Sequence, residues 1–367
     1  MKRALFVYTR NEPDMRVSGE AKKMLMQVDA IKHYGIDCDL IYHNHISRFN
    51  KIQIRIPFIP IYNKKFRDDL LSKASNYDAI YIRKYIFDSS FVSLVKELHK
   101  KTKVIVEIPT YPYDLEWSQF VDLPMLLRDR SGRKKLIGSV DRFVTFSGDS
   151  EIFGVPCINT SNGIDISKIS KRIPRKKKEP KINLVGVANV EKWHGFDRII
   201  NGLHDYYQDG GTIDICFHIV GGGAVIPDLK GLVTGLDLNN HVVFHGPMYG
   251  DDLNGMFNRC DIGVGSFGMF RIGLNDGYTL KLREYSARGI PFIYAYNDSL
   301  IEKNRVPYCK KFSNDNTPIN INQIINFYDE ISKEDSGVVS DTLRGYAQKY
   351  MTWDRQMEPV AQYIIGG

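Results

Sequence analysis

The sequence predicts an α/β protein made of two doubly wound domains. Its 367 residues exceed what one hydrophobic core usually holds, so two domains are expected. Short apolar runs alternate with helical patterns in each half, which is the order that builds a parallel sheet with helices on both faces. A basic segment near the middle interrupts the alternation, which then starts again. Each half is therefore expected to form its own sheet.

The first half opens with an apolar strand at 4–8, a polar loop and a helical pattern at about 19–34. Later runs have the length and composition of buried strands. These expected strands are 36–44, 79–82, 104–108 and 142–146, with a helix at about 90–100. We expect residues 1–170 to form the first domain.

The segment SKRIPRKKKEPK carries too many like charges and prolines to belong to a core, so residues 171–180 are predicted to be an exposed linker. A second domain is expected at 181–345, followed by a last helix at 346–367. Its expected strands are 182–189, 215–223, 241–247, 261–267 and 291–296, with helices at 197–208, 250–259 and 280–288.

Composition limits the function classes. No run of eighteen apolar residues exists, and the first residues turn polar too early for a signal peptide, so a cytoplasmic protein is expected. The five cysteines are scattered and odd in number, without metal-ligand spacing or a disulfide framework. The net charge of +7 suits phosphorylated ligands, an anionic membrane surface or nucleic acid, and does not choose among them.

The stretch 271–291, RIGLNDGYTLKLREYSARGIP, joins a loop to a helix expected to begin near Thr279. Lys281 and Glu284 lie three apart, so both project from one face. Free amides at the helix start, with Lys281 and Arg271, are expected to hold a diphosphate. Glu284 is placed to accept hydrogen bonds from sugar hydroxyls. The alternative is a surface helix whose charged side chains are only solvated.

Two other motifs suggest a dinucleotide site and a metal site, and we reject both. Gly263, Gly265 and Gly268 have the GxGxxG spacing of a dinucleotide site, but the residues after them do not resemble a helix start. Asp37 and Asp39 form a DxD pair at the beginning of a strand, where acids are usually solvated. No metal ion is therefore expected.

Several short motifs, taken in their order along the chain, indicate one protein family. They are Ser18-Gly19 in a glycine loop, 162–165 (NGID), 186–196 (GVANVEKWHGF), 218–223 (HIVGGG), 243–246 (VFHG), the acids Asp276 and Glu284, 284–291 (EYSARGIP) and 350–363. Together they resemble the retaining glycosyltransferases of family 4. The resemblance implies the GT-B fold, in which two Rossmann-like domains face a cleft and a C-terminal helix crosses back to the first domain.

The resemblance also implies roles in binding a nucleoside-diphosphate sugar, with a UDP-sugar as first choice. Glu284 would hold the ribose, and Asp276 would face the transferred sugar. Backbone amides of Gly277, Tyr278 and Thr279 would lie near that sugar and the β-phosphate. Glycine at position 19 would let the first-domain loop approach the donor. We expect Asp276, Glu284 and Lys281 to be the catalytic residues.

This sequence departs from the family pattern at three positions. Asp276 replaces the usual glutamate, Val187 the usual arginine and His194 the usual lysine. Lys192 lies two residues before His194 and is expected to compensate in part. We therefore assign most of the diphosphate binding to Arg271 and Lys281. Side-chain cations would then serve in place of a metal.

The acceptor is expected at the end of the fourth strand, where EIPTYPYD replaces the histidine common in the family. Its candidate residues are Glu107, Thr110, Tyr111 and Tyr113; the alternative is a packed turn. The stretches 49–66 and 124–141 mix basic and apolar residues, which suits contact with an anionic bilayer, although ordinary solvated surface gives the same composition.

The function expected from these features is sugar transfer, with retention, to a glycan or polyprenyl-diphosphate-linked acceptor in bacterial capsule, exopolysaccharide or O-antigen synthesis. Two alternatives stay open, a nucleotide-sugar epimerase and a catalytically silent partner subunit. A nucleic-acid partner is not expected.

Overall fold

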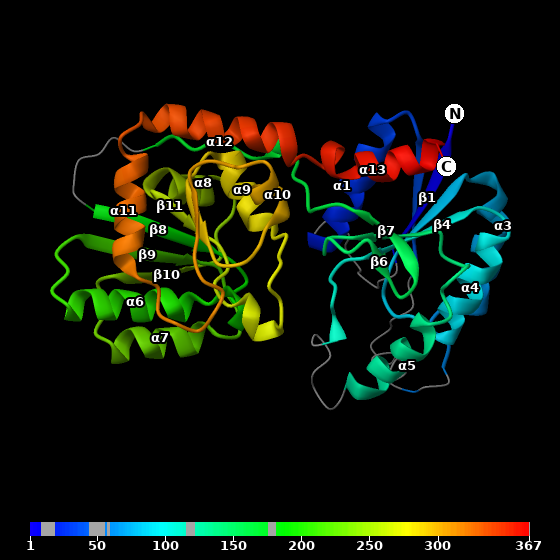
Figure 1. Cartoon of the computed structure of the whole chain (residues 1–367), viewed down its shortest axis with the longest axis horizontal. Coiled ribbons are helices and arrows are strands. Elements are labelled where there is room, and N and C mark those ends of the chain that lie inside the picture. Colours follow the sequence, from blue (N-terminus) through cyan, green and yellow to red (C-terminus); the bar gives the residue numbers. More distant parts are fainter. Residues whose placement is uncertain (9–18, 44–55, 57–58, 115–121, 175–180, 367) are drawn as a thin grey trace. The chain divides into compact units, whose positions relative to one another are not determined.

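The structure, a computed structural model, describes residues 1–8, 19–43, 56, 59–114, 122–174 and 181–366 (Figure 1). The chain divides into two compact units. Unit 1 combines Met1–Ser161 with Trp353–Gly367, and unit 2 is Asn162–Thr352. Each is an α/β unit built on its own mostly parallel sheet, as the sequence predicts.

Among the described residues, the sheet of unit 1 has seven strands in the order β2-β1-β3-β4-β5-β7-β6. All pairs are parallel except β6 with β7. The strands are β1 Arg3–Tyr8, β2 Asp37–Tyr42, β3 Ala79–Arg83, β4 Lys103–Ile108, β5 Arg142–Thr145, β6 Glu151–Ile152 and β7 Val155–Asn159. The described helices are α1 Gly19–His33, α3 Lys64–Lys73, α4 Ser89–His99, α5 Leu123–Arg133 and α13 Trp353–Gly366.

Alternation along β1 divides its side chains between two apolar layers of unit 1. Leu5 and Val7 belong to the layer that includes α4, and Phe6 belongs to the layer of α1 and α13. In that second layer, Met24 of α1 packs in one cluster with Met357 of α13. The last helix of the chain is therefore part of the first unit.

The sheet of unit 2 has six described strands, all parallel, in the order β10-β9-β8-β11-β12-β13. They are β8 Lys181–Val187, β9 Asp214–Val220, β10 Val242–Gly246, β11 Ile262–Val264, β12 Phe292–Tyr294 and β13 Cys309–Lys311. The α-helices are α6 Phe196–Gln208, α7 Ile226–Gly235, α8 Gly250–Arg259, α9 Leu280–Arg288, α10 Ser299–Lys303, α11 Ile321–Ile331 and α12 Ser336–Tyr350. Strand order reverses between β8 and β11, and ligands of such sheets bind beyond the carboxyl ends of the strands at that point.

The first segment of unit 1 ends at Ser161, earlier than the predicted limit of 170. Its last segment begins at Trp353, later than the predicted 346. Residues after Ser161 join unit 2 because Ile164 pairs with Thr352, and its amide donates to Met351. Arg344 of α12 donates to the carbonyls of Ile166 and Ile169. Of the predicted linker 171–180, residues 175–180 lie outside the described part.

The two rejected motifs have structural roles. Asp37 and Asp39 are both ion-paired with Arg3, at 3.0 and 3.3 Å. Gly263 lies within β11, and the glycine motif is followed by a short 3₁₀ turn, η6 Met269–Ile272, instead of an α-helix. No described helix is long and apolar enough to cross a membrane.

Candidate functional site

The amino end of α9 has no side-chain cap. The helix begins at Leu280, and Gly289 ends it in the left-handed conformation with φ 74°, as the sequence predicts. Thr279 precedes the helix in an extended conformation but makes no side-chain bond to its amides. Its hydroxyl instead lies 2.6 Å from the hydroxyl of Tyr296. The first amides of α9 therefore lack a side-chain cap and point positive potential outward.

Lys281 is the second residue of α9. Its Nζ is buried and has no hydrogen-bond partner among the described residues, and it lies 5.4 Å from the ring centroid of Phe196. Burial lowers the pKa of Lys281 to about 7, although the charge of Glu284 raises it. A buried cation without a bound partner is costly. An anion arriving at this position would relieve that cost.

His194 is the neutral neighbour of Lys281. It ends the 3₁₀ turn η5 Lys192–His194 after β8, and its Nδ1 accepts a hydrogen bond from the amide of Glu191 at 2.9 Å. Nδ1 also lies 3.3 Å from the carbonyl of Glu191. In the tautomer that the amide hydrogen bond favours, the proton is on Nε2, which has no partner in the described part of the chain. Burial, with a further effect from the charge of Lys281, lowers the pKa of His194 to about 3. His194 offers one hydrogen bond and no charge, while Lys192 is exposed.

Glu284 lies one turn beyond Lys281 and is held in place. Arg288 donates from Nε to Oε1 of Glu284 at 2.8 Å, and its Nη1 donates to Asn254 at 2.8 Å. The side chain of Glu284 is 33% exposed. Within the described residues its Oε2 has no hydrogen bond, so this oxygen can accept from a ligand hydroxyl.

The loop before α9 is hydrogen-bonded to Asn297. The amide of Gly277 donates to the carbonyl of Asn297 at 2.9 Å, and the side chain of Asn297 donates to Asp276 Oδ1 at 2.9 Å. A Cβ at Gly277 would lie 2.7 Å from the Tyr296 ring, so only glycine fits. The Gly277 amide is therefore already bonded, whereas the predicted amides of Tyr278 and Thr279 have no hydrogen bond among the described residues. Tyr278 is half-buried, next to Asp276.

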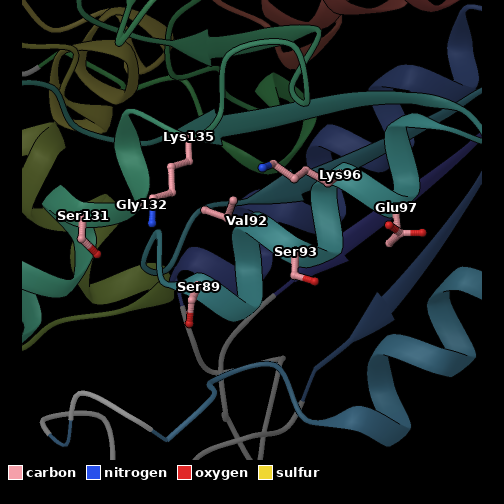
Figure 2. A pocket seen from close by; sticks show the side chains of 8 residues that line it. All are labelled: Ser89, Val92, Ser93, Lys96, Glu97, Ser131, Gly132 and Lys135. Atoms are coloured by element: carbon pink, nitrogen blue, oxygen red, sulfur yellow. The ribbon is translucent and has the colours of Figure 1, made fainter.

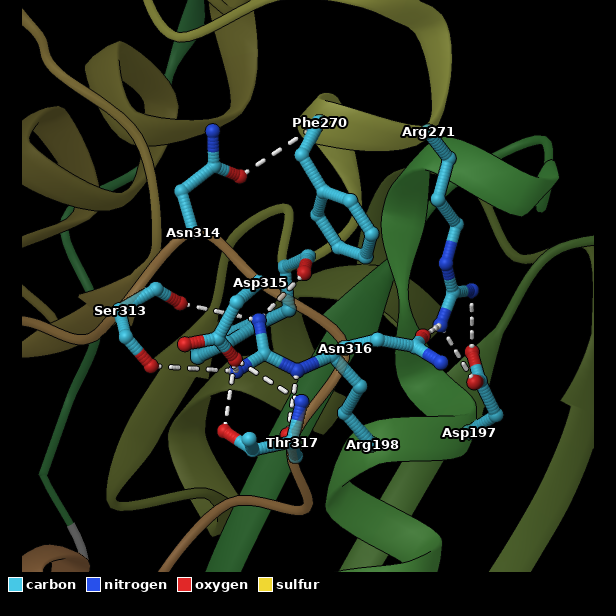
Figure 3. Close-up of polar contacts among 10 residues, drawn as sticks. Asp197, Arg198, Phe270, Arg271, Ser313, Asn314, Asp315, Asn316 and Thr317 are labelled. Atoms are coloured by element: carbon cyan, nitrogen blue, oxygen red, sulfur yellow. Dashed lines mark hydrogen bonds and ion pairs between the residues drawn. The ribbon is translucent and has the colours of Figure 1, made fainter.

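Arg271, predicted to be a principal phosphate ligand, is engaged inside unit 2 (Figure 3). Its two terminal nitrogens donate to the carboxylate of Asp197 at 2.8 and 2.7 Å. They also donate to Asn316 at 2.8 Å and to the carbonyl of Lys192 at 3.1 Å. The sequence could not show this pairing, because Asp197 is 74 residues away. Lys281 is then the cation that carries the phosphate-binding proposal.

Arg198 is a supporting residue that sequence reasoning missed. It is 1% exposed and donates to the carbonyls of Ser313 and Thr317 at 3.0 and 2.7 Å (Figure 3). It also donates to the carbonyl of Phe267 at 2.6 Å. It joins the loop after β11 to the loop after β13. The loop after β11 in turn holds the turn of His194, whose carbonyl accepts from the Phe267 amide at 2.8 Å. No sequence motif marks an arginine with this role.

In unit 1, Glu107 is the centre of a buried ion cluster. It is 0% exposed, bonded to Arg83 and 3.3 Å from Lys23 Nζ. Tyr81 and Gln27 donate to its Oε2 at 2.5 and 2.9 Å. Despite burial, which acts in the opposite direction, Lys23 and Arg83 lower the pKa of Glu107 to about 2. Its predicted contact with an acceptor is therefore not available to the side chain as it lies here.

Tyr113 is also internal. It is 3% exposed, its hydroxyl donates to buried Asp129 at 2.8 Å, and Lys84 Nζ lies 3.6 Å from its ring centroid. Its neighbours Thr110 and Tyr111 are half-buried. Of the four predicted acceptor residues, these two keep part of their surface exposed. Tyr113 lies in the packed turn that was the alternative, and Glu107 is buried within β4.

Solved glycosyltransferase structures are similar to this chain over its whole length. Anabaena HepE in complex with UDP aligns with a TM-score of 0.65 at 13% identity and covers 99% of both chains. Sucrose-phosphate synthase from Thermosynechococcus elongatus aligns with a TM-score of 0.65 at 12% identity, over 99% of this chain and 98% of that one. WaaG, a glycosyltransferase involved in lipopolysaccharide biosynthesis, gives 0.61 and 12%, over 99% and 100%. No protein-family profile matches the sequence, and no curated protein matches it significantly.

This chain has the GT-B glycosyltransferase fold. The predicted fold class is thus confirmed. Within the second GT-B unit, the structure brings Lys281, Glu284 and the amides of α9 together, with His194 beside them. Gly19 is the first residue of α1, but Ser18 and the rest of the loop 9–18 lie outside the described residues.

Proposed function

We propose that this protein is a retaining glycosyltransferase of the family 4 type that uses a nucleoside-diphosphate sugar, with a UDP-sugar as first choice. The observation that carries the proposal is the buried Lys281 ammonium without a partner among the described residues, at the uncapped start of α9. A diphosphate supplies the charge that this position lacks. The proposal is supported by HepE, which has been solved with UDP and with UDP-glucose.

Different residues of unit 2 would bind different parts of the donor. The α9 amides and Lys281 would bind the diphosphate, and Nε2–H of His194 would donate one hydrogen bond to it. The free Oε2 of Glu284 would accept from the ribose hydroxyls. Asp276, restrained by Asn297, would face the hydroxyls of the transferred sugar.

The ammonium group of Lys281 would also assist the chemical step. As the bond between the anomeric carbon and the phosphate oxygen breaks, negative charge grows on the β-phosphate, and Lys281 with the helix amides stabilises it. The acceptor oxygen forms its bond to the anomeric carbon on the face that the phosphate leaves. Because the new bond forms on that same face, the configuration is retained, and the departing phosphate oxygen takes the acceptor proton.

The acceptor side of the proposal rests on unit 1. Thr110 and Tyr111 follow the carboxyl end of β4, the edge at which sheets of this kind bind ligands. We propose that they contact a glycan or lipid-linked glycan, in the assembly of a bacterial surface polysaccharide. Their half-buried side chains leave part of each surface free to pack against a sugar.

Thermal unfolding with a panel of nucleotide sugars tests the donor. A UDP-sugar at about 100 times its Kd should stabilise unit 2 by about 2.7 kcal/mol. Glu284→Ala should remove most of the shift, whereas Glu330→Ala, an exposed glutamate on α11, should keep it. Release of UDP that requires an added acceptor would then show transfer. If no nucleotide sugar shifts the transition, the silent-subunit alternative is favoured.

A further inference from the structure

Unit 2 contains a pocket of about 500 Å³ at the turn between α11 and α12 (Figure 1). Asp261 and Pro291, the residues directly before β11 and β12, also line it. The pocket therefore lies at the amino ends of parallel strands, the edge opposite to the one at which such sheets usually bind ligands. Arg172, another lining residue, donates from its amide to the carbonyl of Arg288 in the last turn of α9 at 2.8 Å. Because α9 is about 13 Å long, this pocket is distinct from the site at its amino end.

The side chain of Arg172 is buried in this pocket without an ion pair to any described residue. It is 7% exposed. Its Nε donates to the carbonyl of Gly289 at 3.0 Å and to Ser340 Oγ at 3.3 Å, and its Nη1 donates to the carbonyl of Cys260 at 2.8 Å. These partners are neutral, and Nη2 donates to no described residue. Burial lowers the pKa of Arg172 to about 10, although the charge of Asp261 raises it. The N–H groups of Nη2 are thus left for a ligand.

Carboxylates supply hydrogen-bond acceptors around the same pocket. Oε2 of Glu334 accepts from the hydroxyl of Tyr308 at 2.5 Å, and Oδ1 of Asp335 accepts from two amides at the start of α12 at 2.9 and 3.1 Å. The second oxygen of each of these carboxylates has no hydrogen bond within the described part of the chain. Together with Asp261, the lining carries three carboxylates and one guanidinium.

This combination of one donor and several acceptors favours a neutral ligand with hydroxyl groups. An anion would bond to Arg172 but would face three carboxylates. A cation would bond to the carboxylates and leave Nη2 of Arg172 without a partner. A hydroxyl group can donate to a carboxylate and accept from a guanidinium, so several hydroxyls on one ring satisfy both. Pro291, Ile331 and Val339 add apolar walls, which suit the C–H surface of a sugar ring.

The groove between α4 and α5 in unit 1 provides a contrast (Figure 2). Its volume is about 340 Å³, and its two lysines, Lys96 and Lys135, are exposed to solvent. Its one acid, Glu97, is already paired with Lys100 at 2.8 Å. None of the described residues that line this groove is a charged side chain buried from solvent. The pocket of unit 2 differs from it in holding a buried guanidinium with a nitrogen left to donate.

We propose that the pocket between α11 and α12 binds a neutral sugar residue of a glycan, at a position distinct from the donor site. Nη2 of Arg172 donates to one sugar hydroxyl, while the second oxygens of Glu334 and Asp335 accept from others. The ring lies against the apolar walls. The inference does not depend on sugar transfer, because the ligand class follows from the lining of the pocket and binding is measured without a donor.

Saturation-transfer difference NMR on the full chain, without nucleotide, tests the class of ligand. At least one of glucose, galactose and N-acetylglucosamine should bind, with a dissociation constant in the millimolar range. Glucuronate, spermidine and inorganic phosphate should each bind at least about tenfold more weakly than that sugar, because each leaves charges of the pocket opposed or unpaired.

Variants with matched controls test the location. Ser336→Trp places an indole at the rim of the pocket and should abolish sugar binding. Ser89→Trp is its control, since Ser89 is also an exposed first residue of a helix behind an aspartate cap, and it lines the groove of unit 1. Glu334→Gln should bind about tenfold more weakly, because it loses a charge-assisted hydrogen bond. Its control, Glu330→Gln on the exposed side of α11, should bind like the wild type.

Arg172→Lys keeps the positive charge but removes Nη2, so it should also bind about tenfold more weakly. If this variant does not fold, Ser336→Trp decides the question, because Ser336 is on the surface.

The proposal is overturned if no neutral sugar binds, or if a charged probe binds more tightly than the neutral sugars. Binding that persists in Ser336→Trp but is lost in Tyr111→Ala would place the sugar at the expected acceptor residues of unit 1, and would overturn it as well. Failure of this proposal is distinguishable from failure of the proposed function. Glu284→Ala should lose UDP-glucose binding and keep the binding of the neutral sugar.

Discussion

The affinity of this protein for UDP-glucose should fall as pH rises above neutrality, because Lys281 then loses its proton. Burial lowers the pKa of Lys281 to about 7 in the unliganded protein. A bound diphosphate favours the charged form and raises that pKa. Binding therefore takes up a proton in the window between the two values. The affinity is therefore highest below pH 7. It declines as the pH rises from the pKa of Lys281 in the free protein toward its pKa in the complex.

The size of the effect follows from the pKa of Lys281. With a value of about 7, the charged fraction of the free protein at pH 8.5 is about one in thirty, so the affinity should be about 30-fold lower than at pH 6. That factor equals about 2 kcal/mol. His194 adds nothing to it, since its pKa of about 3 keeps it neutral throughout the range.

Isothermal titration calorimetry with UDP-glucose measures both the affinity and the proton uptake, the latter from buffers of different ionisation enthalpy. Uptake should be near half a proton at pH 7 and approach one at pH 8. Lys281→Met should bind weakly with no dependence on pH. Lys303→Met, an exposed lysine of α10, should show the wild-type dependence.

The reasoning would be refuted by an affinity that stays constant between pH 6 and 8.5. It would equally be refuted if Lys281→Met kept the wild-type slope, because some other group would then supply the proton.

Two further variants test the internal ion pairs. Arg271→Gln removes the paired contact with Asp197, so the protein should lose about 2 kcal/mol and melt about 4–8 °C lower, while UDP-glucose affinity falls less than in the Lys281 variant. Glu107→Gln leaves Lys23 and Arg83 without their carboxylate and should cost about 3–5 kcal/mol in urea unfolding. Because the pKa of Glu107 is lowered to about 2, its contribution to stability is full above the ordinary glutamate range and is lost as pH falls toward 2.

Each variant has an outcome that would contradict its premise. If Arg271→Gln melts normally yet loses UDP-glucose binding, Arg271 is a phosphate ligand after all. For Glu107 the control is Glu97→Gln, whose exposed pair with Lys100 is screened by water and should contribute little to stability. Equal urea midpoints for the two glutamine variants would show that the buried cluster does not stabilise unit 1.

The sequence predicted the layered fold because alternating strand and helix patterns depend on neighbours along the chain. It also placed α9 within one residue of its bounds, since Gly289 supplies the left-handed residue that stops a helix. Lys281 and Glu284 share one face for the same local reason. The domain limits were less accurate, because the pairing of Ile164 with Thr352 joins residues far apart in the chain.

What the sequence by itself determined about this protein is the set of local features, namely the two sheets and a helix that carries Lys281 and Glu284 behind an uncapped start. Only the tertiary structure decided which charges are free. Arg271 and Lys281 look equivalent in sequence, yet one is bound to Asp197 and the other has no hydrogen-bond partner among the described residues. The physical reason is that the energy of a charge depends on what distant segments place around it. Helical periodicity and turn preferences record nothing of those segments.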